Sequence, residues 1–272
     1  MSAMKLISAV KLKRAQDLLM AYRPYSDAYH DTTMNVAKRC DREAHPLLRK
    51  SDDPKKLHLV FITSDRGLCG SFNSSLIRKL ETYIVTDAKT YDEITFSFLG
   101  RRGREHFVRE GYKVANSYIG ITDRNYDEIS EKISEQLIKE FIKGDSDEVV
   151  LVYNYFKSAL TQEITYEKVL PIEVDAESED GSQIDYLYEP SKKGILSELL
   201  PKYVQVRVQR AIQESMTSEH ASRMTAMENA TNNANDVIKK LTLQYNKTRQ
   251  AMITTELMDI VNGTEALSKG DE

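Results

Sequence analysis

The C-terminal third of the chain carries a continuous stripe of apolar and small residues at helical spacing. Residues 202–262 contain neither proline nor glycine, and the stripe positions alternate in steps of three and four. This spacing is that of the a and d positions of a coiled coil. The stripe consists of Met224, Met227, Thr231, Ala234, Ile238, Leu241, Tyr245, Thr248, Met252 and Thr255. It predicts one helix of roughly 90 Å, longer than a small domain is wide, which must find a partner or join a helical bundle.

A second long helix is predicted at the N-terminus. Residues 1–23 also lack glycine and proline, and a heptad-like stripe continues past Pro24, which is the candidate position of a kink, toward Pro46. Lys11 and Arg14 interrupt this stripe. We expect the two terminal helices to satisfy their stripes by packing antiparallel as a coiled coil.

Between these helices, short β-branched and aromatic runs alternate with helical patterns. The runs lie at 57–63, 94–99, 114–119 and 149–156, and the helical patterns at 72–85, 101–110 and 127–143. This β-α-β-α order predicts an α/β domain with a doubly wound, Rossmann-like sheet that is mostly parallel. A further strand at 162–170 is expected at an edge of the sheet.

Changes in pattern and composition divide the chain into four predicted segments. Residues 1–50 form the N-terminal helix, 51–172 the α/β domain, and 196–272 the C-terminal helix. The segment 173–195 is mostly acidic, contains glycine and proline, and has little apolar periodicity, so it is predicted to be a linker or hairpin.

Composition narrows the possible functions. The net charge of −4 gives no overall positive field for nucleic acid. No apolar run approaches the length of about 18 residues that a membrane-spanning helix needs, and no signal peptide is recognisable, so a water-soluble chain is expected. Cys40 and Cys69 lie far apart without a metal-ligand spacing, which favours a reducing compartment and predicts neither a disulfide nor a zinc site.

The segment 64–73 (SDRGLCGSFN) is the strongest candidate for chemistry, because a loop between a strand and a helix can bind phosphate. It lacks GxGxxG and a Lys followed by Ser or Thr, so a structural turn is favoured over a nucleotide site. Cys69 lies where a helix N-terminus would lower the pKa of a thiol, but no base lies nearby in sequence.

Other reactive or charged side chains form no catalytic pattern. The histidines share no ligand spacing and are expected at scattered surface or helix positions, while 100–104 (GRRGR) is expected to be a solvated basic turn. We therefore predict no catalytic residue, metal site or cofactor, and favour an interaction or mechanical protein. A nucleotide-binding α/β domain with helical arms is the alternative, and a homomeric coiled-coil scaffold is a third possibility.

Three stretches together resemble the gamma subunit of F-type ATP synthase, its central rotor. They are 3–16 (AMKLISAVKLKRAQ), 64–73 and 253–267 (ITTELMDIVNGTEAL). The resemblance covers essentially the whole chain. Ser71 and Thr264 depart conservatively from the family pattern, and the family implies further basic residues ahead of Met1, so the first stretch of the N-terminal helix is expected to be missing.

The resemblance implies that the paired helices occupy the cavity of a hexamer of alpha and beta subunits. The globule and the lower helices would contact the epsilon subunit and the c-ring of the membrane sector. One copy per complex would couple ion flow to ATP synthesis, and catalysis would belong to the beta subunits, so the chain itself would not be an enzyme. Nothing resembles the redox segment of plastid members, which favours a peripheral protein on the cytoplasmic face of a bacterial membrane.

The resemblance also implies which residues bind partners. Met4, Lys11 and Arg14, with Lys13, match the N-terminal helix facing the hexamer. Arg249, Gln250, Thr254 and Glu256 match polar positions that can hydrogen-bond loops of the beta subunits. Exposed charges contribute on the order of 1 kcal/mol each, so we expect no single one of them to be essential.

Overall fold

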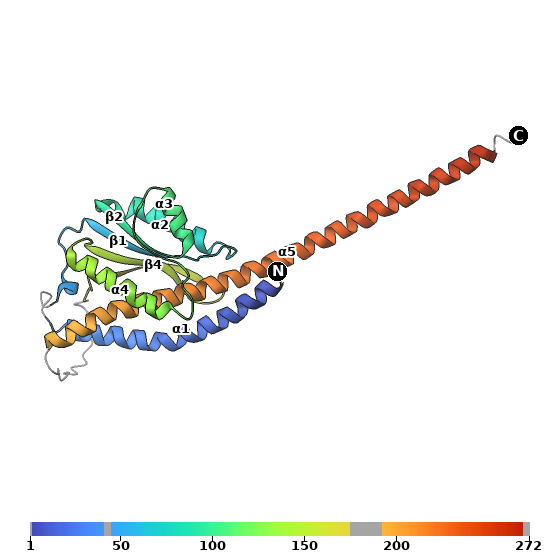
Figure 1. The fold of residues 1–272 in the computed structure, drawn as a ribbon. Helices are drawn as coiled ribbons and strands as arrows, with labels where there is room; N and C mark the ends of the chain where they lie inside the picture. The colour runs from blue at the N-terminus through green and yellow to red at the C-terminus, as the bar shows by residue number, and fades with distance from the viewer. Residues whose placement is uncertain (1, 41–44, 175–191, 269–272) are drawn as a thin grey trace.

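The computed structural model describes residues 2–40, 45–174 and 192–268, and it contains one five-stranded sheet and two long helices (Figure 1). The strands are β1 (Lys56–Ile62), β2 (Glu93–Leu99), β3 (Lys113–Tyr118), β4 (Glu148–Phe156) and β5 (Gln162–Leu170). The helices are α1 (Ser2–Ala37), α2 (Phe72–Thr86), α3 (Arg101–Arg109), α4 (Tyr126–Lys143) and α5 (Lys192–Ser268), with short 3-10 helices at Pro46–Leu48 and Ala88–Thr90.

The sheet has the order β3-β2-β1-β4-β5. Strands β3, β2, β1 and β4 are parallel, and β5 pairs antiparallel with β4 at the edge. The doubly wound, mostly parallel α/β fold is therefore confirmed, including the edge position of β5. Near-continuous burial along β1 and β4 follows from helices on both faces of the sheet.

One face of the sheet packs against α2 and α3 through an aromatic core. Phe61, Phe96, Phe98 and Phe107 are fully buried, and the Phe61 ring meets the Phe107 ring edge to face at a centroid distance of 5.4 Å. Gly103 lets α3 approach this core closely, because a Cβ at that position would lie 2.6 Å from the Phe61 ring. The segment 100–104, expected as a solvated basic turn, is thus mostly the first turn of a packed helix.

The other face is covered by α4 and by the first half of α5. Ile133 and Leu137 of α4 join Leu196, Leu200 and Val204 of α5 in one apolar core with the sheet. This packing explains why α5 begins at Lys192 although Gly194 and Pro201 argue against a helix there. Burial of Leu196 and Leu200 outweighs the hydrogen bond that a proline within a helix removes.

Helices α1 and α5 run antiparallel, as predicted: Lys5 pairs with Glu228, Arg23 with Glu214, and the Tyr29 hydroxyl donates to the Leu199 carbonyl. α1 contains Pro24 but ends at Ala37, short of the predicted extension toward Pro46. α5 extends beyond Asn262 and through Gly263. In Figure 1 the N-terminus lies near the middle of α5, and the rest of α5 continues well past it.

The predicted pairing is therefore wrong for the outer part of the stripe. Met227 is buried, and Met224 packs against a small core of Leu12, Leu19, Phe156 and Ala221. From Ile238 onward the stripe residues are exposed, because α1 begins too far down the helix to cover them. The four segment boundaries remain a prediction, and most of the proposed linker 173–195 lies outside the described residues.

Candidate partner-binding surface

Residues 235–264 of α5 form an exposed arm, in which every residue is solvent-exposed. Eleven large apolar side chains on this arm are between 45% and 71% exposed: Val237, Ile238, Leu241, Leu243, Tyr245, Met252, Ile253, Leu257, Met258, Ile260 and Val261. Contiguous apolar surface of this extent marks an interaction site.

The apolar residues are distributed differently along the arm. Ile238, Leu241, Tyr245 and Met252 follow one narrow stripe, since consecutive residues of a helix are rotated by about 100°. Beyond Met252, the side chains of Ile253, Leu257, Met258, Ile260 and Val261 share one broad face that covers about 160° of the circumference, and polar residues such as Glu256 and Asp259 occupy the opposite side. Both parts of the arm are thus suited to a partner through an apolar face, and this face is wider at the tip (residues 252–261) than at the base.

The arm is continuous with a well-packed helix, which explains how it forms without packing of its own. Propagation from a formed helix avoids the cost of nucleation. Threonine side chains within it bond back to the preceding turn, as in Thr254, whose hydroxyl donates to the Gln250 carbonyl at 2.9 Å. Lys239 and Asp236 form an exposed ion pair at 3.8 Å.

The four predicted C-terminal contact residues all lie on this arm. Gln250 and Thr254 are one turn apart, and Arg249 and Glu256 are two turns apart, so each pair shares a face. In the described part of the chain, neither Arg249 nor Glu256 has an ion-pair partner. Both are therefore available to polar groups of another chain.

The predicted N-terminal residues lie elsewhere. Met4 is 53% exposed near the start of α1, but Arg14 pairs with Asp123 at 2.9 Å between its Nε and Oδ2, and Lys13 pairs with Asp17. Lys11 is exposed on the same part of α1. These basic residues lie beside the globule, well below the arm, so the structure does not bring the two predicted sets together.

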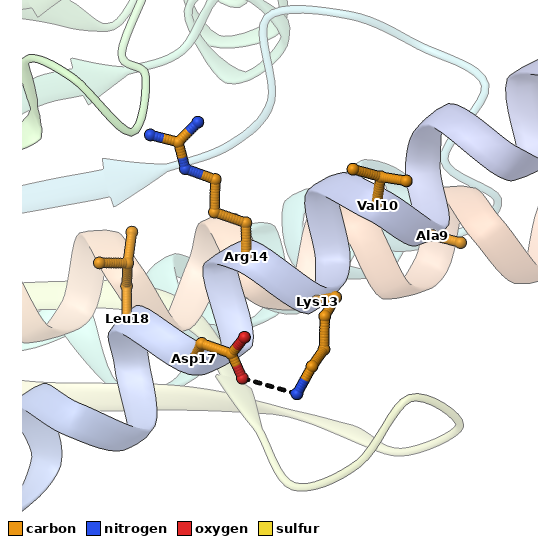
Figure 2. A pocket seen from close by; sticks show the side chains of 6 residues that line it. All are labelled: Ala9, Val10, Lys13, Arg14, Asp17 and Leu18. Carbon is orange, nitrogen blue, oxygen red and sulfur yellow. Dashed lines mark hydrogen bonds and ion pairs between the residues drawn. The ribbon is translucent and has the colours of Figure 1, made fainter.

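A shallow pocket on the outer side of α1 includes two of these residues. It is lined by Ala9, Val10, Lys13, Arg14, Asp17 and Leu18, and Figure 2 shows the Arg14 side chain directed away from the Lys13–Asp17 pair. All six lining residues come from one helix, so this surface is open rather than enclosed. Its exposed Val10 was not recognised in the sequence because it falls outside the stripe.

The loop 64–73 uses its polar groups internally. The Asn73 side-chain oxygen accepts from the Ser64 amide at 3.0 Å, and the Ser64 hydroxyl donates to the Arg66 carbonyl at 2.7 Å. Arg223 of α5 donates to the same Arg66 carbonyl at 3.2 Å. The loop therefore holds the globule against α5, as expected of a structural turn.

Cys69 within this loop is 2% exposed, and burial raises the pKa of its thiol. This shift is opposite to the lowering that a helix N-terminus would produce. A buried thiol with a raised pKa is a poor nucleophile, so Cys69 is not suited to covalent catalysis.

One histidine is not at the surface, contrary to expectation. His58 of β1 is buried, and its Nε2 lies 2.8 Å from the Ser97 hydroxyl and its Nδ1 3.1 Å from Glu140 Oε2. Asn116 and Gln136 donate to the other oxygen of Glu140. The order of contacts, Ser97 to His58 to Glu140, resembles that of a catalytic triad. Ser97 is also buried, however, so the cluster is enclosed in the core.

None of the helices in the described part of the chain combines the length and hydrophobicity of a membrane span. The same residues contain no cluster of three or more His, Cys, Asp and Glu side chains that could hold a metal ion.

The fold and surface together define a class of protein: an α/β globule carrying a pair of long antiparallel helices, one of which extends as an arm for binding a partner. The chain matches the family model described as ATP synthase over residues 1–267. The ATP synthase gamma chain of Bdellovibrio bacteriovorus is 42% identical over 273 residues, which cover 97% of this chain and 92% of that one. The ATP synthase gamma chain of Anaeromyxobacter sp. is 41% identical over 268 residues, with the same two coverages.

Solved structures agree with the sequence relatives. A chain in the central stalk and c-ring structure of Tetrahymena thermophila mitochondrial ATP synthase has a TM-score of 0.63 and 26% identity, covering 85% of this chain and 98% of that one. A chain of the Euglena gracilis mitochondrial enzyme has a TM-score of 0.63 at 18% identity, covering 97% of both, and supports the fold alone. The chain belongs to the ATP synthase gamma chain family.

Proposed function

We propose that this chain is the central rotor of an F-type ATP synthase, which couples transmembrane ion flow to conformational change in a hexamer of alpha and beta subunits. The observation that carries the proposal is the broad, exposed apolar face at the tip of the arm, on a chain of this family. Such a face is stabilised by contact with apolar surface of a partner, and the inner wall of a ring of subunits would provide that surface.

The remaining surfaces fit the other partners of a rotor. The globule and the lower ends of α1 and α5 would contact the epsilon subunit and the c-ring, with one copy of the chain per complex. Catalysis would take place in the beta subunits, whose open and closed states the rotating arm would select. The chain would be a non-catalytic, peripheral subunit on the cytoplasmic face of a bacterial membrane.

We assign partner contacts to two sets of residues. Arg249, Gln250, Thr254 and Glu256 would hydrogen-bond loops of the beta subunits from the arm. Met4, Lys11 and Arg14 would contribute lower down, where Arg14 also holds Asp123 of the globule. Exposed polar contacts are individually weak, so the apolar tip supplies most of the affinity.

Reconstitution with alpha and beta subunits tests the proposal. ATP hydrolysis by the hexamer should require the full chain, and a chain ending at residue 234, which keeps the globule and the paired helices, should fail to support it. Hydrolysis that is equally fast without the chain would contradict the rotor function. Saturable ATP binding that depends on the loop 64–73 would favour the nucleotide-binding alternative, and a stable homo-oligomer would favour the scaffold.

A further inference from the structure

Arg23 of α1, Glu214 of α5 and the last residue of β4, Phe156, meet in one buried polar cluster, which we call the joint. Arg23 Nε donates to Glu214 Oε1 at 2.9 Å, and Arg23 Nη2 donates to Glu214 Oε2 at 2.7 Å. The same Nη2 donates to the Phe156 carbonyl at 2.6 Å. The Phe156 amide donates to Glu214 Oε2 at 3.0 Å, which closes the cluster.

The surroundings make the joint rigid. The Glu214 side chain is 0% exposed and that of Arg23 is 19% exposed. The Arg23 guanidinium lies 4.9 Å from the centre of the Tyr155 ring. A planar guanidinium bound to both oxygens of a carboxylate fixes distance and orientation together, and burial protects the pair from screening by salt.

The other contacts between α1 and the globule are of a different kind. Among the described side chains of α1, Arg23 is the one that hydrogen-bonds a strand. Leu12 and Leu19 share one apolar cluster with Phe156, and Arg14 reaches Asp123 through an exposed ion pair. Apolar contacts are not directional, so they permit small rotations and slides that the joint does not.

We propose that Arg23 and Glu214 are the positioning residues that lock α1 to α5 and to the α/β globule, so that torque turns all three as one body. This inference rests on the proposed function as a rotor. A force on the globule reaches β4, and the joint holds α1 and α5 to the end of that strand at one point. Without the joint, α1 could shift against the sheet and against α5, which keeps its own core contacts with the sheet. The helix pair would then be less stiff, and rotation of the arm would lag behind rotation at the base.

The test uses the assembled complex with its c-ring in sealed vesicles. The double variant Arg23→Met with Glu214→Leu removes both charges and retains apolar volume, so neither partner is left as an unpaired buried charge. Arg210, which lies 3.7 Å from Glu214, keeps its ion pair with Asp27. We expect a several-fold loss of ions pumped per ATP hydrolysed, with hydrolysis itself largely retained. The matched control is Arg207→Met with Glu167→Leu, a similarly buried pair that joins α5 to β5 without α1.

A second variant and the requirement for the unmodified chain separate failure of the joint from failure of assembly and from failure of the proposed function. Arg23→Lys retains the charge but cannot form the forked contact, so it should show a partial loss of coupling even if the double variant fails to assemble. An unchanged pumping ratio in assembled complexes of either variant, or an equal loss in the control, would overturn the joint. If hydrolysis by the hexamer does not require the unmodified chain at all, the proposed function fails instead.

Discussion

Glu140 of α4 is a partly buried carboxylate whose hydrogen bonds determine its ionisation. The hydrogen bond with His58 lowers its pKa from an ordinary 4.5 to about 2, against the opposing effect of burial, and Gln136 and Asn116 add to the lowering. The charged form therefore stabilises the packing of α4 against β1, β2 and β3.

We expect Glu140→Gln to lower the free energy of unfolding at about pH 7 by about 1–3 kcal/mol. A carboxylate whose pKa is lower in the folded chain than in the unfolded chain stabilises the fold at every pH above its pKa in the unfolded chain. This stabilisation is lost as the pH falls through the folded-state pKa of about 2. The difference in the free energy of unfolding between Glu140→Gln and the unmodified chain, measured with denaturant, should therefore become smaller as the pH is lowered toward about 3. Glu131→Gln on the exposed side of α4 is the control. A loss of stability in Glu140→Gln that is the same at every pH would contradict the role of the charged Glu140 side chain.

Cys69 and Cys40 should react differently with thiol reagents. Cys69 is buried and its thiol pKa is raised, whereas Cys40 is only half-buried near the end of α1. Alkylation near neutral pH followed by mass spectrometry should label Cys40 first and Cys69 only on unfolding. Rapid labelling of Cys69 in the folded chain would show that the loop 64–73 is open.

At the scale of elements, local patterns predicted the sheet and its helices well. The predicted strand at 162–170 coincides with β5, and the other strands and short helices differ by about one residue at their ends. These elements have period-2 or period-3.6 patterns that local sequence carries. α5 begins at Lys192, before the predicted segment 196–272 and ten residues before the stretch free of glycine and proline that starts at 202, because burial of Leu196 and Leu200 is a tertiary effect that overrides Pro201.

Close packing of α3 on β1 depends on the glycine at position 103. Gly103→Ala should destabilise the chain by about 1–3 kcal/mol, because the added methyl group would lie 2.6 Å from the Phe61 ring and 2.9 Å from Thr63 Cγ2. Gly263→Ala is the control, since nothing lies within 4 Å of its Cβ position. Thermal unfolding measures both, and equal melting temperatures for all three chains would contradict this account of the α3 contact.

The exposed arm should be the least protected part of α5 in the isolated chain. Amides of residues 235–264 lack tertiary packing, so they open locally at low free energy, whereas those of 204–221 lie against α1 and the sheet. Hydrogen exchange followed by mass spectrometry should show this contrast. Addition of alpha and beta subunits should slow exchange in the arm, and unchanged exchange on complex formation would argue against the arm as the contact.

At the scale of the whole molecule, the apolar tip determines the predicted binding to the hexamer. Leu257→Asp with Ile260→Asp should weaken binding at least about tenfold, because each substitution places a charge on the face that is expected to meet apolar surface of the partner. Asn232→Asp with Asn233→Asp adds the same charge at exposed positions below the arm and is the control. Titration of labelled chain into alpha and beta subunits measures the affinity of both variants, and equal affinities would contradict binding through the apolar face of the tip.

The sequence by itself determined the two long helices, the parallel sheet and the family resemblance, because periodicity and motifs are local properties of the chain. It also located the polar residues of the arm. It did not reveal that Arg14 is paired within the chain or that His58 is buried.

Only the tertiary structure decided which part of the stripe is covered and where the joint forms. Arg23 and Glu214 are 191 residues apart, and no spacing rule links them. Their contact depends on how far α1 runs along α5 and where β4 ends, and both are set by packing of the whole molecule. The long helix is consequently half core element and half exposed arm, although its sequence pattern continues through both.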